Sequence, residues 1–256
     1  MSGRNHPCAA ALTFIAVALA IQPAHSQDEP HGAAQTLWQA ANRDRAARNL
    51  SPLKWSASLA AAAQQHAARM ARADALSHQL PGEAALADRA SQSGARFSSV
   101  AENVAEGPSA DSIHRQWMNS PPHRANLLDP QLDSVGIAVE SRGGTLFAVE
   151  DFSLAVSALT LTEQEGIVID ELRKRGLRLM DIGADARRSC ALDNGYAGKH
   201  TPSFILHFAT SDLQNLPGML DQRIQTGKYH AAAVGACPSA GKTAFAAYRL
   251  AVLLYE

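Results

Sequence analysis

His123, which follows Pro121 and Pro122, is one of the residues of this chain best suited to binding a metal ion or accepting a proton. Pro121 forces the residue before it out of the helical region and is itself tolerated at the start of a helix, so one helix is predicted to end near Asn119 and another to begin at Pro121. Ser120 is then expected to cap the second helix. His123 falls in its first turn, where exposed N–H groups and the positive end of the helix dipole favour the neutral imidazole. Neutral imidazole is the form that binds a metal ion or accepts a proton.

Two further groups can join this histidine. His78 follows a predicted helix in a loop rich in helix-breaking residues, and Glu102 alternates with Val100 and Val104 in the period of a strand. Two imidazoles and one carboxylate can hold zinc with water in the open position, although without thiolates the affinity is expected to be weak and pH-dependent. The alternative is that each histidine only orders its own segment. Glu102 is then a structural centre of hydrogen bonding rather than a general base.

The apolar patterns predict the elements that position these residues. In the first half they are helices at 33–49, 57–73, 84–93 and 109–119, and a hairpin of strands at 132–141 and 145–152. In the second half they are a helix beginning near Thr160, a helix at 217–225, and strands at 204–209, 229–237 and 244–255. Overlapping capping boxes, Thr160 with Glu163 and Thr162 with Glu165, mark the start of the first of these helices. His66, among the alanines of the second helix, is expected to be packed or half-exposed.

The N-terminal residues resemble a secretory signal peptide. Residues 1–26 contain one basic residue, Arg4, then an apolar run over 9–21 and a small-residue site at 24–26. The apolar run is too short to span a bilayer comfortably, and no later run approaches the roughly 20 apolar residues that a membrane helix needs. We therefore expect cleavage near Ser26 and export to the periplasm or the cell exterior, without an integral membrane span. The alternative is a retained N-terminal anchor.

Charge and cysteine content narrow the class of protein further. Without residues 1–26 the chain has 22 basic and 24 acidic residues, so it lacks the basic character that a nucleic-acid partner requires. Cys8 leaves with the signal peptide, and the two cysteines that remain are Cys190 and Cys237. In an exported protein they are expected to form a disulfide, which would close a loop of nearly fifty residues and contribute about 4 kcal/mol in the chain-entropy model.

Several motifs occur in an order that resembles the CAP superfamily (cysteine-rich secretory proteins, antigen 5 and pathogenesis-related 1 proteins), in its bacterial SCP-domain branch. The motifs, spread over residues 35–153, are Ser77-His78, Ala101-Glu102-Asn103, Trp117 through His123 to Leu128, Ser134-Val135-Gly136-Ile137 and Val149-Glu150-Asp151-Phe152. The resemblance implies a three-layer α-β-α sandwich with a surface cleft lined by histidine and glutamate. It also implies that His78 and His123 are the cleft histidines, which in several members hold a divalent metal, and that Glu102 is the cleft glutamate.

This chain departs from the family pattern at three positions. Animal and plant members have a second glutamate where Ser120 stands, and the family's glycine before the cleft glutamate is Ala101. Bacterial members usually have glutamine where Glu150 stands, so Glu150 can supply an extra carboxylate near the cleft. The expected cleft residues are His78, Glu102, His123, Ser120 and Asn103. His78 and His123 are the expected ligands of zinc or another divalent cation.

We therefore expect an α/β protein with a CAP domain at 33–155 and a smaller α/β module of unrecognised family, with one disulfide, at 160–256. The preferred function is a secreted binding module with a metal-capable cleft, whose ligand by resemblance is a lipid or sterol-like molecule. A second hypothesis is a metal-assisted hydrolase in which Glu102 or Glu150 activates water. A third is that the module at 160–256 docks to a cell-envelope component, with the first domain as its scaffold.

Overall fold

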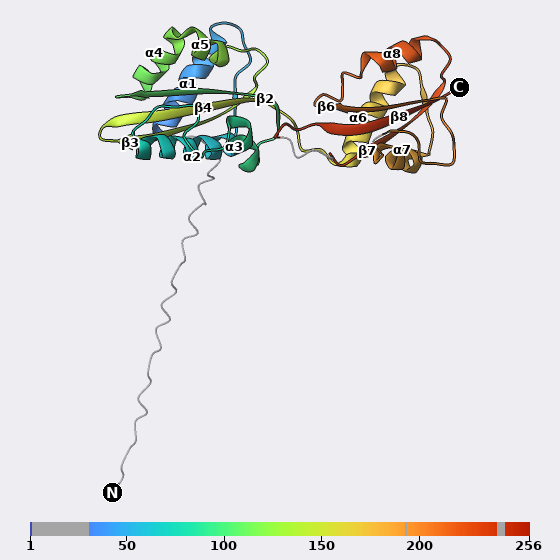
Figure 1. Cartoon of the computed structure of the whole chain (residues 1–256), viewed down its shortest axis with the longest axis horizontal. Helices are drawn as coiled ribbons and strands as arrows, with labels where there is room; N and C mark the ends of the chain where they lie inside the picture. Colours follow the sequence, from blue (N-terminus) through green and yellow to red (C-terminus); the bar gives the residue numbers. More distant parts are fainter. Residues whose placement is uncertain (2–30, 193, 240–243) are drawn as a thin grey trace.

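The computed structural model describes Met1 and residues 31–192, 194–239 and 244–256, which form two α/β sandwiches in succession along the chain (Figure 1). The predicted signal peptide lies outside the described residues apart from Met1. Among the described residues, no helix combines the length and apolar character needed to cross a membrane. We call residues 32–155 the first unit and residues 161–255 the second unit.

The first unit is a three-layer α-β-α sandwich, as predicted. Its mixed sheet has the order β1-β3-β4-β2, in which β1 is parallel to β3 and the other pairs are antiparallel. The strands are β1 (Lys54–Trp55), β2 (Phe97–Gly107), β3 (Ser134–Arg142) and β4 (Thr145–Ala155). One face is covered by α1 (Gly32–Ala46), α4 (Ala110–Asn119) and α5 (Pro121–Leu127), and the other by α2 (Ala57–Ala73) and α3 (Leu86–Gln92) (Figure 1).

Strand β2 lies at one edge of this sheet, and its side chains point alternately towards the helices on one face and those on the other. Val104 packs against alanines of α2, whereas Ala105 belongs to the core beneath α4. Because side chains of a strand alternate between faces, Glu102 shares the α2 face with Val104, and Asn103 shares the α4 and α5 face with Ala105. The two polar residues of the predicted cleft motif therefore point to opposite sides of the sheet.

The position of α5 is fixed by a buried arginine of α1. The guanidinium of Arg45 donates to the carbonyl oxygens of Ser51, Leu127, Asp129 and Leu132 at 2.8–3.1 Å. Its side chain is almost completely buried, and this burial lowers the pKa of Arg45, which Asp129 partly offsets. These bonds join the end of α1 to the chain that follows α5, so the short helix carrying His123 is held against the body of the unit.

The second unit has a sheet in the order β5-β7-β8-β6, in which β5 is parallel to β7 and the other pairs are antiparallel. The strands are β5 (Arg178–Leu179), β6 (Phe204–Thr210), β7 (Ala231–Cys237) and β8 (Tyr248–Tyr255). Helices α6 (Leu161–Lys174) and α8 (Gly218–Gln225) pack on one face, and α7 (Gly183–Cys190) packs on the other. Of these elements, β5 and α7 were not predicted from the sequence.

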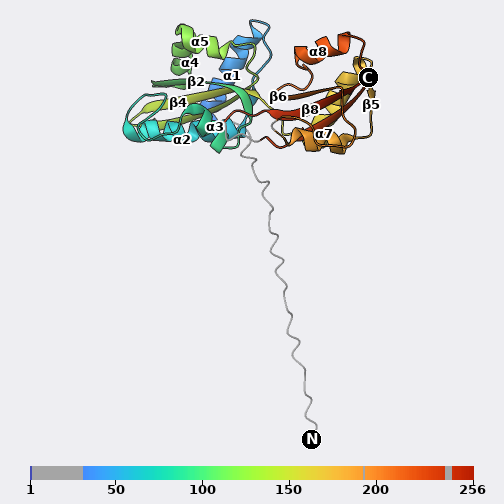
Figure 2. The ribbon, with the colours of Figure 1, turned by 45° about the vertical axis from the view of Figure 1, so that its right-hand side comes forward.

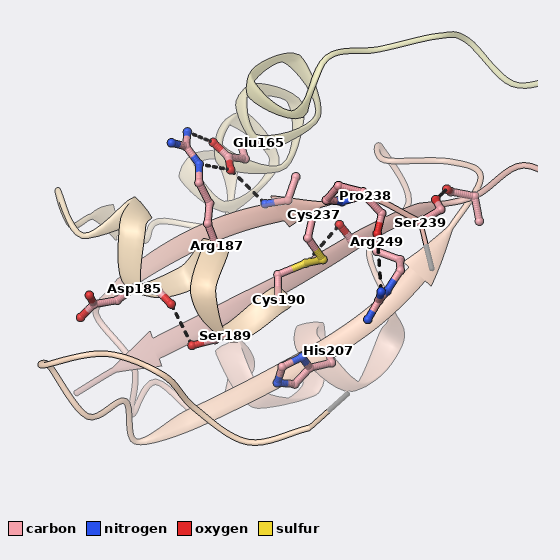
Figure 3. Close-up of a disulfide and its surroundings, with 12 residues drawn as sticks. Glu165, Asp185, Arg187, Ser189, Cys190, His207, Cys237, Pro238, Ser239 and Arg249 are labelled. Atoms are coloured by element: carbon pink, nitrogen blue, oxygen red, sulfur yellow. Dashed lines mark hydrogen bonds and ion pairs between the residues drawn. A yellow bond between two sulfur atoms is a disulfide. The ribbon is translucent and has the colours of Figure 1, made fainter. Parts of the chain in front are cut away.

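The start of α6 uses only one of its two capping-box signals. Thr160 and Glu163 form the reciprocal pair, each side chain bonded to the other residue's backbone. The carboxylate of Glu165 instead accepts bonds from the Arg187 guanidinium and, at 2.9 Å, from the backbone N–H of Ala236. Glu165 thus connects α6, α7 and β7 from a buried position (Figure 3).

The predicted disulfide between Cys190 and Cys237 is present. Cys190 is the last residue of α7 and Cys237 is the last residue of β7, so the bond fastens the helix to the sheet (Figure 3). Both cysteines are buried, together with Ala251 of β8.

Candidate functional site

The predicted cleft residues gather around the outer edge of β2. His78 comes from the loop between α2 and α3, on one side of the sheet, and His123 comes from α5 on the other side. Because β2 is the last strand in the sheet order, no further strand separates the two loops at this edge. The candidate site is therefore built around a strand edge, with support from both faces.

Glu102 supports His78. The Nδ1 atom of His78 lies 2.8 Å from one carboxylate oxygen of Glu102, and the Arg89 guanidinium of α3 binds the other oxygen. The Glu102 side chain is only 3% exposed, whereas that of His78 is 59% exposed. The buried Arg89 guanidinium holds the carboxylate in place, and the carboxylate in turn orients the exposed imidazole. Nε2 is the ring nitrogen of His78 that stays available to a ligand.

A second buried pair fixes the loop that carries His78. The Nδ1 atom of His66 lies 2.9 Å from both carboxylate oxygens of Glu83, and its Nε2 atom lies 2.8 Å from the carbonyl oxygen of Ser77. His66 is fully buried, so it is packed, as expected. Its bond to the residue before His78 is a positioning role that the sequence pattern did not reveal.

Buried amides support His123 from the other face. Asn103 donates through Nδ2 to the carbonyl oxygen of His123 at 3.1 Å. Asn126 of α5 donates to the carbonyl oxygen of Glu102 at 3.3 Å and to the side-chain oxygen of Asn103 at 3.0 Å. Asn103 is fully buried, so it fastens α5 to β2 instead of lining the cleft.

The neutral form of the His123 ring is favoured, as the sequence predicts, but burial and not the helix dipole is the main cause. Burial lowers the pKa of His123, and the positive charge of His78 lowers it further. The neutral imidazole is therefore favoured by desolvation and by the second histidine.

Ser120 occupies the predicted position before α5, but its side chain does not cap the helix. A capping side chain accepts from the backbone N–H two or three residues into the helix. Here Pro121 and Pro122 fill the first two helical positions, and proline has no N–H, so of these two partners only the N–H of His123 remains. The prolines themselves impose the helix start that was attributed to the serine.

The extra carboxylate expected from Glu150 lies inside the protein. Glu150 pairs in register with Asn103, on the face opposite Glu102, and is fully buried. Burial raises the pKa of Glu150 to about 8, against a smaller lowering by its 3.4 Å hydrogen bond from Asn103. Glu150 is therefore protonated at neutral pH and does not present a carboxylate to solvent at the cleft.

Asp151 is a buried acid that the sequence pattern did not single out. It stands opposite Glu102 in the register of β2 and β4, and its two oxygens accept no hydrogen bond from the described residues. Burial raises the pKa of Asp151 well above its usual range, and the negative charge of Glu102 raises it further.

The described residues contain no group of three or more histidine, cysteine, aspartate or glutamate side chains that could hold a metal ion. The available donors are Nε2 of His78 and the ring of His123, because Glu102 is occupied by His78 and Arg89. Two imidazoles would leave two positions of a tetrahedral zinc ion to water or to an external ligand.

Comparisons with known proteins match part of this chain to one protein family. Residues 38–152 match the family model of the cysteine-rich secretory protein (CAP) family. The uncharacterized protein YkwD of Bacillus subtilis is 27% identical over 103 residues, which is 40% of either chain. An extracellular SCP-domain protein of Bacillus anthracis is 28% identical with a TM-score of 0.45, over 48% of this chain and 40% of that one.

An outer surface protein of Borrelia burgdorferi is 21% identical with the same TM-score of 0.45, over 48% of this chain and 92% of that one. This chain thus spans about 40% of the length of the first two relatives. The residues matched by the family model end within β4 of the first unit.

Proposed function

Because residues 38–152 belong to the cysteine-rich secretory protein (CAP) family, in its bacterial branch, we propose that this chain is an exported binding module whose ligand site is the histidine pair at the edge of β2. The observation that carries the proposal is that His78 and His123 come from segments on opposite sides of this strand edge, with His78 bonded to Glu102 and the backbone of His123 bonded to Asn103. Export is supported by the signal-like residues 1–26 and by the disulfide, which is typical of oxidising compartments.

A divalent cation, zinc or another, is the ligand that the donors favour. The His78 ring has one nitrogen tied to a buried carboxylate, an arrangement that orients the free nitrogen of metal-binding histidines. The resemblance also implies lipid or sterol-like ligands, and the second unit is a candidate for docking to a cell-envelope component. The contacts around the histidine pair favour the cation over both.

The same contacts argue against the metal-assisted hydrolase. A general base must be free to take a proton from water, and both oxygens of Glu102 are already bonded, to His78 and to Arg89. Glu150 faces the other side of the sheet, is fully buried and is protonated at neutral pH. Neither carboxylate is placed to activate a water molecule between the histidines, so binding is the better interpretation.

Zinc titration of residues 27–256 by isothermal calorimetry tests the proposal. The wild type is expected to bind one zinc per chain, and His78→Ala and His123→Ala are each expected to lower the affinity at least about tenfold, since even partners of metal ligands contribute 10–100-fold. The matched control is His230→Ala, which removes an exposed histidine of the second unit. Equal zinc binding by the wild type and by the His78→Ala/His123→Ala double variant would eliminate the proposed site.

A further inference from the structure

The second unit repeats the first unit element by element. Each consists of a helix, a two-residue strand, a second helix, a long strand, further helix and a C-terminal hairpin, with α3 and α5 as the additions of the first unit. The sheet orders β1-β3-β4-β2 and β5-β7-β8-β6 correspond strand for strand, and so do the parallel and antiparallel pairings. In both units the second helix, α2 or α7, covers one face, and the flanking helices cover the other (Figure 2).

A glycine marks the same point in both units. A Cβ atom on Gly136 of β3 would lie 2.0 Å from the backbone nitrogen of Ala60 in α2. A Cβ atom on Gly235 of β7 would lie 2.2 Å from the backbone nitrogen of Arg187 in α7. In each unit, therefore, the second helix rests directly on the third strand at a position that only glycine permits.

These glycines align the two sheets residue by residue. The row Glu102–Asp151–Gly136 of the first sheet corresponds to the row His207–Ala251–Gly235 of the second. The next row, Asn103–Glu150–Ile137, corresponds to Phe208–Leu250–Ala236. The two rows of the first sheet contain four polar residues, Glu102, Asp151, Asn103 and Glu150, and none of them is kept in the second sheet. Of the four corresponding residues in the second sheet, only His207 is polar.

The disulfide also has a counterpart in the first unit. Cys237 lies two residues after Gly235, as Ala138 lies two residues after Gly136. Cys190 lies three residues after Arg187, as Ala63 lies three residues after Ala60. Ala63 and Ala138 belong to one buried cluster between α2 and the sheet. The covalent bond between α7 and β7 therefore stands where the first unit has two alanines of one buried cluster.

We propose that residues 161–255 are a second unit of the CAP fold, in which the supports of the ligand site have been replaced and the helix–sheet contact has become a disulfide. The Nε2 atom of His207 lies 2.8 Å from the carbonyl oxygen of Gly195, in the loop after α7 that corresponds to the loop carrying His78. No helix corresponding to α5 stands between α8 and β7 in the described chain, so His123 has no counterpart. As a consequence that rests on the proposed function, one chain would bind one cation, in the first unit.

An engineered disulfide tests the correspondence independently of any ligand. If the units match as aligned, the Ala63→Cys/Ala138→Cys variant of residues 27–256, which lack Cys8, will form a second disulfide, because its new cysteines correspond in position to Cys190 and Cys237. The control is Ala62→Cys/Ala138→Cys, in which one cysteine is moved by one residue along α2. After unfolding without reductant, thiol titration should find no free thiol in the first variant and two in the control, with the pairing identified by peptide mass spectrometry.

Two free thiols in Ala63→Cys/Ala138→Cys, or equal cross-linking of the control, would overturn the proposal. Failure of that variant to fold would also count against it, because cysteines fit the corresponding positions of the second unit. This test does not involve zinc binding, so its result can be interpreted even if the proposed ligand site is disproved.

Discussion

Replacing Glu150 by glutamine should stabilise the first unit at neutral pH. Glu150 is fully buried, and its single hydrogen bond among the described residues is the 3.4 Å bond from Asn103. Burial raises its pKa from 4.5 to about 8, so the folded protein must take up a proton that the unfolded chain has already released. Glutamine resembles the protonated acid in shape and can accept the same bond from Asn103, but it does not titrate.

The size of the effect follows from the two pKa values. Between pH 4.5 and about 8 the folded state binds more protons than the unfolded state, so the free energy of unfolding of the wild type falls as the pH rises. One pH unit in this window costs about 1.4 kcal/mol, so the wild type loses about 3 kcal/mol between pH 4.5 and pH 7. Glu150→Gln should match the wild type near pH 4.5 and exceed it by about 3 kcal/mol at pH 7.

Tryptophan fluorescence provides an assay specific to this unit. All three tryptophans, Trp38, Trp55 and Trp117, belong to the first unit, so urea unfolding followed by their emission reports on it alone. Glu106→Gln, at an exposed position of β2, is the matched control and should leave the pH profile unchanged. The reasoning is refuted if Glu150→Gln is less stable than the wild type at pH 7, or if their difference stays constant from pH 4.5 to pH 8.

Two further variants test the supports of each unit. Arg89→Ala removes the cation that binds buried Glu102 and should destabilise the first unit by about 3–5 kcal/mol in the tryptophan assay. Part of this loss should be recovered in Arg89→Ala/Glu102→Gln, which also removes the unpaired carboxylate. A loss below about 1 kcal/mol, or no recovery, would contradict the assigned ion pair. Cys190→Ala/Cys237→Ala opens a loop with a sequence separation of 47 and should cost the second unit about 4 kcal/mol. The near-ultraviolet signal of the four tyrosines, all in the second unit, follows that change, and an unchanged unfolding midpoint of this signal would contradict the stabilising role of the disulfide.

The sequence predicted the helices and strands whose apolar periodicity is regular or whose ends carry clear signals. Helix α2 begins at Ala57 as predicted, because Ser56 caps it by accepting from the N–H of Leu59. Helix α7 was missed because its eight residues are mostly polar or small and show no apolar stripe, although the sheet buries one side of it. Strand β5 has only two residues, too few to show an alternating pattern.

The candidate site was predictable in its exposed residues and much less so in its supports. His78, Glu102 and His123 stand in motifs with a recognisable order, but Arg89, which binds Glu102, is brought to it only by the packing of α3. The same is true of Glu83, which holds His66. The one available signal was the expectation that a carboxylate sharing a strand face with valines needs a partner, and that argument does not say which residue provides it.

The alternation of β2 explains why the histidine pair depends on two consecutive residues. Glu102 points to the α2 face and bonds the ring of His78, while Asn103 points to the α5 face and bonds the backbone carbonyl of His123, so one dipeptide at a strand edge contacts both residues. A slip of one residue in the register of β2 would exchange these faces and remove both supports together. In the second unit the corresponding dipeptide is His207 and Phe208, which supplies neither a carboxylate nor an amide. The two sheets have the same strand order, so the presence or absence of these supports depends on the side chains at the strand edge and not on the sheet.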